Sequence, residues 1–248
     1  MNIDKKYYQE INENLTNTIQ DTNISAPNKK VGKVRDAYFL NDKVVMISTD
    51  RQSAFDRVLA AIPYKGAVLN SVSAWWFKKT EHLFPNHLIS TPDPNVSIVE
   101  KCTVFPVEFV VRGYITGTTD TSLWTVYNNG DREYCGNSLP EGLKKNDKLD
   151  KPMLTPTTKD KVHDRPVSRE EIIDLGLMSA EDYDLAAKMS LDLFAFGQET
   201  AKKNGLILVD TKYEIGTDSK GKIKFVDEIH TPDSSRFWIS SSYKDRIN

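Results

Sequence analysis

The alternation of apolar and polar residues predicts two β-hairpins, one in each half of the chain. In the first, residues 31–40 and 44–49 flank a tight turn at Asn41-Asp42. The second begins with four consecutive apolar β-formers at 206–209, a pattern typical of a buried strand. A turn signal at 217–221 follows, and residues 223–229 form the expected return strand.

The segments between the two hairpins mix strand and helix patterns. Residues 102–114 have the composition of a long strand, and 136–156 that of a loop. Helices are expected at 7–19, at 70–79, after a capping box at Ser168 and Glu171, and from Ser179 to the stop signal Asn204-Gly205. Strands, a helical region and a final hairpin follow one another, which favours an α+β fold over a doubly wound sheet.

Composition excludes several classes of protein. The 248 residues suffice for one large domain or two lobes, and 39% hydrophobic with 27% charged residues is ordinary for a globular protein. A net charge of −2, without a long basic run, gives no reason to expect nucleic acid as a partner. No apolar stretch reaches membrane-spanning length, so no membrane partner is expected.

The expected location is the cytoplasm. The polar first residues do not resemble a signal peptide, and two cysteines, Cys102 and Cys135, do not make a disulfide framework. The four histidines have neither paired spacing nor cysteine partners, which argues against a zinc site.

Candidate chemistry is densest on the last hairpin. Asp210, Lys212 and Glu214 alternate along one strand and therefore share a face. If that face is buried, a metal or phosphate has to complete the charge balance, whereas an edge strand would simply expose it to water. An even-numbered hairpin loop would bring Asp227 to the face of Glu214, where two carboxylates suit Mg²⁺, but an odd loop without a bulge would turn it away.

Two further segments carry charges that suit a nucleotide. Gly32 lies beside Lys33 and Arg35, so backbone can approach phosphates while the cations neutralise them, although the P-loop spacing is absent. The alternative is a basic, solvated edge strand. Glu108 interrupts an apolar strand, and it faces either solvent or a ligand.

Two arginine-containing segments suit a phosphate or carboxylate. Arg112 leaves the long strand in a Gly- and Thr-rich turn that includes Thr118, with an ion-paired loop arginine as the alternative. Asp233, Ser234 and Arg236 follow the last hairpin and offer a carboxylate, a hydroxyl and a guanidinium beside the candidate metal site.

Several of these segments together resemble one enzyme family. The motifs are Leu-Ile-Leu-Val-Asp-x-Lys-x-Glu (206–214), Asp-Glu-x-x-Thr-Pro-Asp-Ser-Ser-Arg-Phe-Trp (227–238), Gly-Lys-Val-Arg-Asp (32–36), Asp-Arg-Gln-Ser-Ala-Phe-Asp (50–56), Lys-Gly-Ala-Val-Leu-Asn (65–70) and Phe-Pro-Val-Glu-Phe-Val-Val-Arg-Gly-Tyr (105–114). In this order they resemble the SAICAR synthetases (phosphoribosylaminoimidazole-succinocarboxamide synthases) of purine biosynthesis. Similar proteins continue past Arg-Phe-Trp with a further C-terminal helix, whereas this sequence ends ten residues after Trp238.

The resemblance implies a fold and a set of residue roles. The fold would be two-lobed α+β with antiparallel sheets and ATP between the lobes: 1–107 with a phosphate-covering hairpin, and 108–248 with the substrate and metal site. The implied roles are ATP binding by Gly32, Lys33, Arg35 and Glu108; substrate binding by Arg112, Thr118, Asp233, Ser234 and Arg236; Mg²⁺ binding by Glu214 and Asp227; and catalysis by Asp210, Lys212 and Lys33.

The expected activity is that of an ATP-dependent ligase joining L-aspartate to carboxyaminoimidazole ribonucleotide (CAIR), with ATP as co-substrate. Its partners would be these small molecules, and the sequence leaves monomer and homo-oligomer open. One rival is a small-molecule kinase with a hydroxyl acceptor, which the second arginine-containing segment argues against. Another is a nucleotide-binding regulatory module without turnover, which has no need of both the acidic pair and the basic loop.

Overall fold

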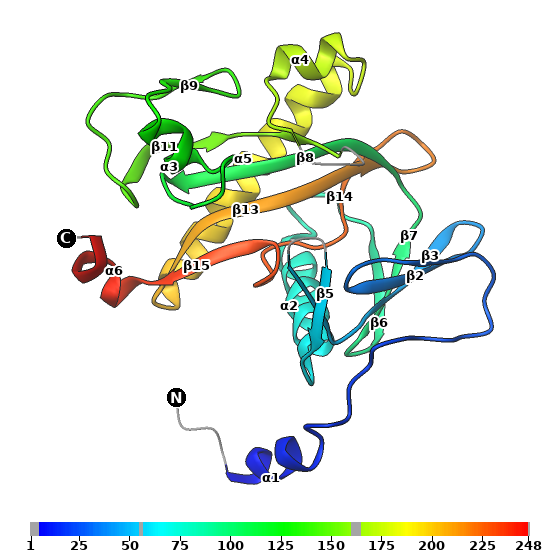
Figure 1. Ribbon diagram of the computed structural model, residues 1–248. Coiled ribbons are helices and arrows are strands. Elements are labelled where there is room, and N and C mark those ends of the chain that lie inside the picture. Colours follow the sequence, from blue (N-terminus) through cyan, green and yellow to red (C-terminus); the bar gives the residue numbers. More distant parts are fainter. Residues whose placement is uncertain (1–4, 55–56, 160–164, 248) are drawn as a thin grey trace. The chain divides into compact units, whose positions relative to one another are not determined.

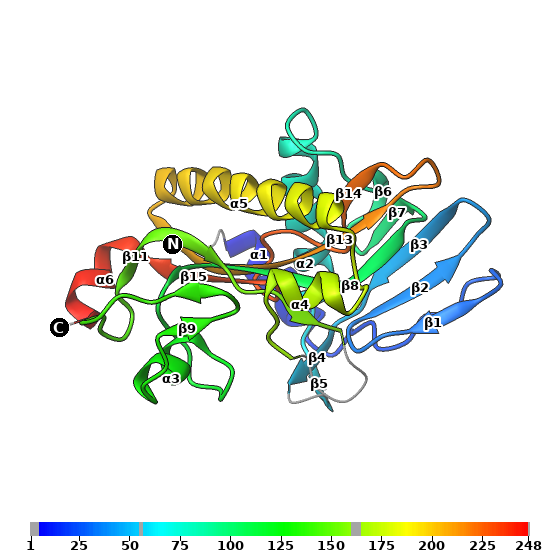
Figure 2. The same cartoon turned by 90° about the horizontal axis from the view of Figure 1, so that it is seen from above.

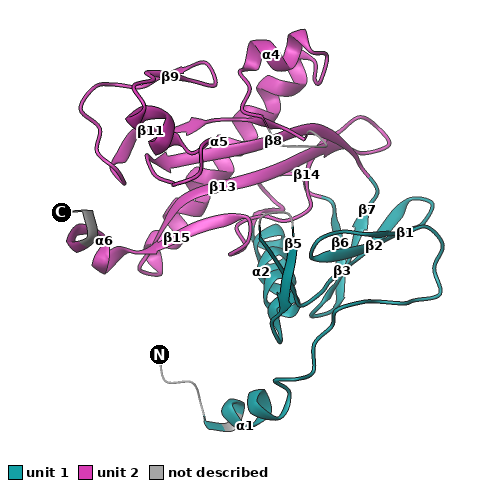
Figure 3. Ribbon diagram, viewed as in Figure 1, with its two compact units in different colours: residues 1–79, 87–101 teal, residues 80–86, 102–248 magenta. Residues whose placement is uncertain are grey.

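The computed structural model describes residues 5–54, 57–159 and 165–247, and the chain divides into two compact units (Figure 3). Unit 1 comprises residues 1–79 and 87–101, and unit 2 comprises 80–86 and 102–248. The lobe boundary expected at 107/108 falls inside strand β8 (Thr103–Tyr114), which belongs wholly to unit 2. The functions expected of the two lobes stay predictions.

Unit 1 is built on an antiparallel sheet with the order β1-β2-β3-β7-β6 (Figure 1). The predicted first hairpin is confirmed: β2 pairs with β3, and Phe39 lies opposite Val44. Tyr38 and Val99 are buried in the core of this unit. The strands are β1 (Lys29–Val31), β2 (Arg35–Phe39), β3 (Lys43–Ser48), β6 (Leu88–Asp93), β7 (Val96–Glu100), and a separate pair, β4 (Arg51–Ala54) and β5 (Arg57–Ala61).

The helices α1 (Lys5–Glu13) and α2 (Lys65–Thr80) differ in extent from the sequence-based prediction. The first ends at Glu13, six residues before the predicted end at 19. The second begins at Lys65, five residues before the predicted start at 70. Gly66 belongs to its first turn, where an added Cβ would lie 2.3 Å from the carbonyl oxygen of Ser48, so the close approach of the backbone requires glycine.

Unit 2 contains a six-stranded sheet in which β13 (Leu206–Thr217) is central. β13 pairs antiparallel with β8, β14 (Ile223–Val226) and β15 (Ser235–Ile239). β8 in turn pairs with β11 (Lys148–Leu154) and β12 (Thr157–Thr158). The apolar run that begins β13 is buried at Leu208 and Val209, as expected of a core strand.

The region 136–156 is only partly the predicted loop, because it contains β11 and β10 (Asn137–Ser138), which pairs with β9 (Glu133–Tyr134). β11 lies at the edge of the sheet and includes Pro152. An edge strand tolerates proline and charged residues, so its sequence resembles that of a loop.

Capping residues set the helix starts in unit 2. Ser168 and Glu171 form the predicted capping box before α4 (Arg169–Asp174), and Ser179 accepts from the backbone of Asp182 at the start of α5 (Ala180–Lys203). α5 runs along one face of the sheet and packs against β13 (Figure 2). The short helices α3 (Leu123–Asn128) and α6 (Ser240–Ile247) complete the unit. Over the described ranges, no helix is long and apolar enough to cross a lipid bilayer.

Candidate functional site

The two carboxylates on the charged face of β13, Asp210 and Glu214, are largely buried, whereas the Lys212 side chain between them is 42% exposed. Asp210 lies opposite Arg112 of β8 on one side and Arg236 of β15 on the other. Asp210 is 8% exposed. Because β13 is central, the alternative of a solvated edge strand is wrong, and the charges on this face need partners.

Lys212 and Glu108 form one such partnership between β13 and β8. The Lys212 ammonium donates to Glu108 Oε1 at 2.7 Å, and the Thr157 hydroxyl approaches Glu108 Oε2 at 3.4 Å. Burial acts to lower the pKa of Lys212, but the neighbouring carboxylates outweigh it and raise that pKa above its ordinary value. Glu108 is 6% exposed, so the reading of a solvent-facing acid is wrong.

Glu214 and Asp227 lie near one another although hairpin parity does not align them. Thr217 pairs with Ile223, which leaves the five residues 218–222 in the loop, so the odd-numbered alternative is the one observed. In this register Asp227 would continue β14 on the face opposite to Glu214. The strand ends first, and Asp227 adopts a positive φ of 63°. Burial and the charge of nearby Asp227 together raise the pKa of Glu214.

Lys159 is a site residue that the sequence reasoning missed. Its ammonium forms an ion pair with Glu214 Oε2. Its backbone N–H donates to the carbonyl oxygen of Pro106 at 3.1 Å, which extends the pairing of β12 with β8. Period-two alternation places Thr157 and Lys159 on one face, but the strand of only two residues gave no recognisable pattern.

The donor set around Glu214 fits a hard divalent cation. Two partly buried carboxylates lie near one another, and the Lys159 ammonium already places a positive charge on one of them. Among the residues that the structure describes, no cluster of three His, Cys, Asp or Glu side chains could hold a metal. Mg²⁺ does not need one, because it retains water molecules and binds substrate phosphates alongside one or two carboxylates.

Next to Asp210 lies a cavity of about 430 Å³ whose lining is strongly cationic. It gathers six of the predicted residues, and Lys145 as a further cation that the sequence reasoning missed. The six are Arg112, Thr118, Asp210, Lys212, Ser234 and Arg236. Asp233 is exposed and does not line this cavity in the described part of the chain. Such a lining suits a ligand with more than one anionic group.

The carboxylate of Asp210, which lines this cavity, has only part of its hydrogen-bonding capacity satisfied. Arg236 Nε lies 3.6 Å from Asp210 Oδ1, while Asp210 Oδ2 is buried without a hydrogen-bond partner. Burial raises the pKa of Asp210, and the charges of Arg236 and Arg112 oppose that rise. Arg112 itself donates through Nε to the Thr155 hydroxyl at 2.8 Å. An incompletely satisfied buried carboxylate is a candidate to accept a proton or hydrogen bond from a ligand.

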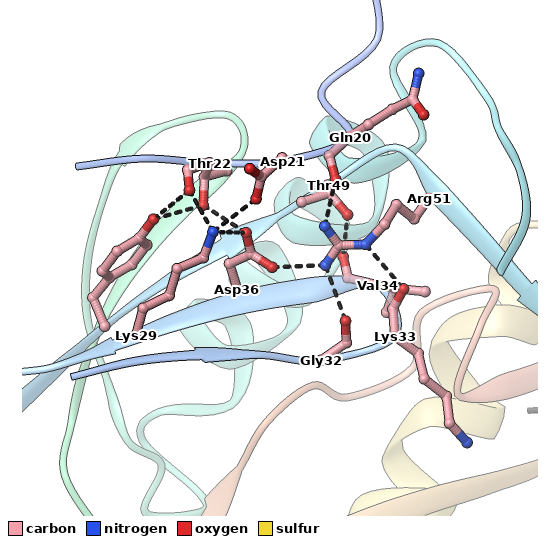
Figure 4. A network of polar contacts seen from close by, with 11 residues as sticks. Gln20, Asp21, Thr22, Lys29, Gly32, Lys33, Val34, Asp36, Thr49 and Arg51 are labelled. Atoms are coloured by element: carbon pink, nitrogen blue, oxygen red, sulfur yellow. Dashed lines mark hydrogen bonds and ion pairs between the residues drawn. The ribbon is translucent and has the colours of Figure 1, made fainter. Parts of the chain in front are cut away.

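In unit 1, buried Arg51 forms hydrogen bonds with the backbone of the turn that contains Gly32 and Lys33 (Figure 4). The Arg51 guanidinium donates to the carbonyl oxygens of Gly32 at 3.0 Å and Lys33 at 3.1 Å, and to Asp36 Oδ1 at 2.7 Å. The Lys33 side chain points away from this network. The turn closes where Gly32 N–H donates to the carbonyl oxygen of Arg35 at 2.8 Å.

Asp36 is the buried anion of this network. Its burial would raise its pKa, but hydrogen bonds from Thr22, Arg51 and Lys29 together lower it. Lys29 forms an ion pair with Asp36, and the Lys33 residue is exposed. Of the 50–56 motif, Asp50 accepts from the backbone N–H groups of Ile19 and Gly66, and Phe55 and Asp56 lie outside the described residues.

Comparison with known proteins gives consistent matches over most of the chain. A family model described as SAICAR synthetase matches residues 28–248. A phosphoribosylaminoimidazole-succinocarboxamide synthase of Legionella pneumophila (strain Lens) is 57% identical over 230 residues, covering 93% of this chain and 74% of that protein.

Solved structures agree with the sequence matches. A SAICAR-synthase from Saccharomyces cerevisiae complexed with SAICAR superimposes with a TM-score of 0.79 at 33% identity, covering 91% of this chain and 81% of that one. A SAICAR synthetase (Type-2) in complex with ADP gives a TM-score of 0.74 at 27% identity, covering 87% and 86%. The α+β fold with antiparallel sheets that the sequence predicted is confirmed.

Proposed function

Because this chain belongs to the SAICAR synthetase family, we propose that it joins L-aspartate to CAIR and converts ATP to ADP and phosphate. The observation that carries the proposal is the cationic cavity beside Asp210. CAIR bears a phosphate and a carboxylate, and Arg112, Lys145 and Arg236 supply positive charge for both. Thr118 and Ser234 add hydroxyl donors, and Asp233 would have to reach the ribonucleotide from its exposed turn.

ATP is the co-substrate of the family, and the residues that would hold it lie in both units. Gly32, Lys33 and Arg35 are proposed to contact its phosphates. The Arg51 bonds support this, because they fix the backbone of the turn while Lys33 remains exposed. Glu108 is proposed to accept from the ribose hydroxyls. Placement of ATP between the lobes is part of the same proposal.

Glu214 and Asp227 are proposed to hold Mg²⁺. When bound, the ion would offset negative charge on the ATP phosphates and on the acceptor carboxylate. Lys212, which donates to Glu108, is proposed to stabilise phosphoryl oxygens, and Lys33 would do so from the turn in unit 1. These roles rest on the charge pattern of the described residues.

The proposed chemistry has two steps. The CAIR carboxylate oxygen attacks the γ-phosphorus of ATP, which breaks the bond to the ADP oxygen and gives an acyl phosphate. The aspartate amine then attacks the carbonyl carbon, phosphate leaves, and the amine loses a proton. Asp210 is proposed to orient the substrate or accept this proton, because one of its oxygens is buried without a partner.

ADP release provides the direct test. The protein with ATP, Mg²⁺ and CAIR should release ADP continuously only when L-aspartate is added, with SAICAR formed in equal amount. A small-molecule kinase would instead phosphorylate a hydroxyl acceptor, and a regulatory module would release no ADP. Oxygen-18 in the CAIR carboxylate should appear in the phosphate, and label-free phosphate would contradict the ligase chemistry. The cytoplasmic location stays a prediction, as does each residue role.

A further inference from the structure

We infer that the Lys159 ammonium occupies the cation position of the proposed Mg²⁺ site and must be displaced from Glu214 before the metal binds. The inference rests on the proposed metal-binding role of Glu214 and Asp227. It assigns to Lys159 a function that neither the motifs nor the predicted ligands include: a built-in competitor that compensates the acidic pair until the metal arrives.

The first support is the way the sheet directs Lys159 toward the acidic pair. Thr157 lies opposite Glu108, and Glu108 lies opposite Glu214, so three adjacent strands align these residues. Side chains two positions apart share a face, which puts Lys159 on the face of Thr157 and Glu108. The backbone bond from Lys159 N–H to the carbonyl of Pro106 fixes the start of the side chain.

The second support is a local irregularity that opens the path across β8. The register between β13 and β8 shifts between Glu214 and Gly216, opposite the β8 segment that contains Pro106. Proline has no N–H for the ladder and is found in sheets at edges or bulges. From its place beside Pro106, Lys159 crosses β8 and reaches Glu214 Oε2 on β13.

The third support is the charge balance. On this face Lys212 donates to Glu108, and Lys159 pairs with Glu214. The Glu214 side chain is only 16% exposed, and Asp227 adds a second negative charge beside it. Separating the Lys159 ammonium from Glu214 without a replacement would leave a poorly hydrated carboxylate next to another acid. A divalent cation can replace it, because it brings more charge to the same oxygens.

The Lys159 ammonium is also able to move away from Glu214. Its side chain is 31% exposed and retains a flexible stem of four carbons, so the ammonium can move without changing the backbone bond to Pro106. A displaced ammonium on this face would meet the phosphates that the metal carries. The exchange therefore couples release of Lys159 to arrival of metal and nucleotide.

The test measures Mn²⁺ binding by electron paramagnetic resonance in the absence of nucleotide, at a fixed pH of 8 and low salt. Lys159→Met should bind Mn²⁺ about five- to tenfold more tightly than the wild type, because the competing ion pair is gone. Lys159→Arg, which keeps the charge, should bind close to the wild-type value. Lys188→Met removes an exposed lysine from its pair with Asp192 on α5 and should have no effect.

Unchanged or weaker Mn²⁺ binding by a folded Lys159→Met protein would overturn the inference. If that variant does not fold, the test is made on the wild-type protein by reductive methylation followed by mass spectrometry. Lys159 should be methylated faster with Mg²⁺ than without it. Equal rates would overturn the inference. Wild-type ADP release with CAIR and aspartate is measured in parallel. Loss of the metal effect with normal turnover contradicts only the role of Lys159, whereas absent turnover contradicts the proposed function.

Discussion

Lys212 Nζ lies 2.7 Å from Glu108 Oε1, so an ammonium and a buried carboxylate from two adjacent strands neutralise one another. The two residues are 104 positions apart in the sequence. Their pairing explains how β13 can carry a charged face without being an edge strand. Glu214, farther along the same face, is paired instead with Lys159 and lies near the carboxylate of Asp227.

Glu214→Gln and Asp227→Asn are each expected to lower turnover by about a hundredfold or more, because one carboxylate ligand is lost while the shape is kept. Steady-state ADP release at limiting Mg²⁺ measures the effect, and circular dichroism checks the fold. Glu141→Gln, which changes an exposed acid paired with Arg132, is the matched control. Near-normal activity of either site variant would rule out the metal assignment.

Arg236→Ala should raise the KM for CAIR about ten- to a hundredfold, since it removes a charge-assisted hydrogen bond to the substrate and the cation beside Asp210. The KM for ATP should change little. Initial-rate kinetics with each substrate varied in turn separate the two. Arg169→Ala, in an exposed pair with Asp184, controls for the loss of an arginine. An equal rise in both constants would move Arg236 to the ATP side.

Arg51→Met should weaken both the turn at Gly32 and the stability of unit 1. The change leaves Asp36 buried without its guanidinium, and breaking a buried ion pair costs about 3–5 kcal/mol. Chemical denaturation gives the free energy of unfolding, and the KM for ATP reports on the turn. Arg57→Met, an exposed arginine of β5, should leave both near the wild-type values. A stable variant with an unchanged KM for ATP would contradict this role.

His230 predicts a specific pH dependence of stability. It is fully buried beside the Tyr213 hydroxyl, and burial lowers its pKa to about 3, against an ordinary value of 6.5. Between these values the unfolded chain takes up a proton that the folded protein does not. The free energy of unfolding therefore falls as pH drops from 6.5 toward 3, by up to about 1.4 kcal/mol per pH unit from this group.

The measurement compares denaturation of the wild type and His230→Gln from pH 6.5 to pH 4. The wild type should lose more stability across this range than the variant does. His82→Gln changes an exposed histidine and should keep the wild-type slope. Parallel curves for the wild type and His230→Gln would show that His230 is protonated in the folded protein.

The sequence by itself determined the local features of this protein. Period-two alternation placed Asp210, Lys212 and Glu214 on one face of a strand, because neighbouring side chains in any strand point to opposite sides. The hairpin of β2 and β3 and the capping residues Ser168 and Ser179 followed from equally local rules. The order of the motifs was enough to indicate the family.

Only the tertiary structure decided which charges meet. That Glu108 neutralises Lys212 depends on the pairing of β8 with β13, and that Lys159 reaches Glu214 depends on β12 joining β8. Asp227 follows the end of β14 with a positive φ, and hairpin parity does not align it with Glu214. The first two relationships join segments far apart in the chain, and the third depends on a local turn; local periodicity encodes none of the three.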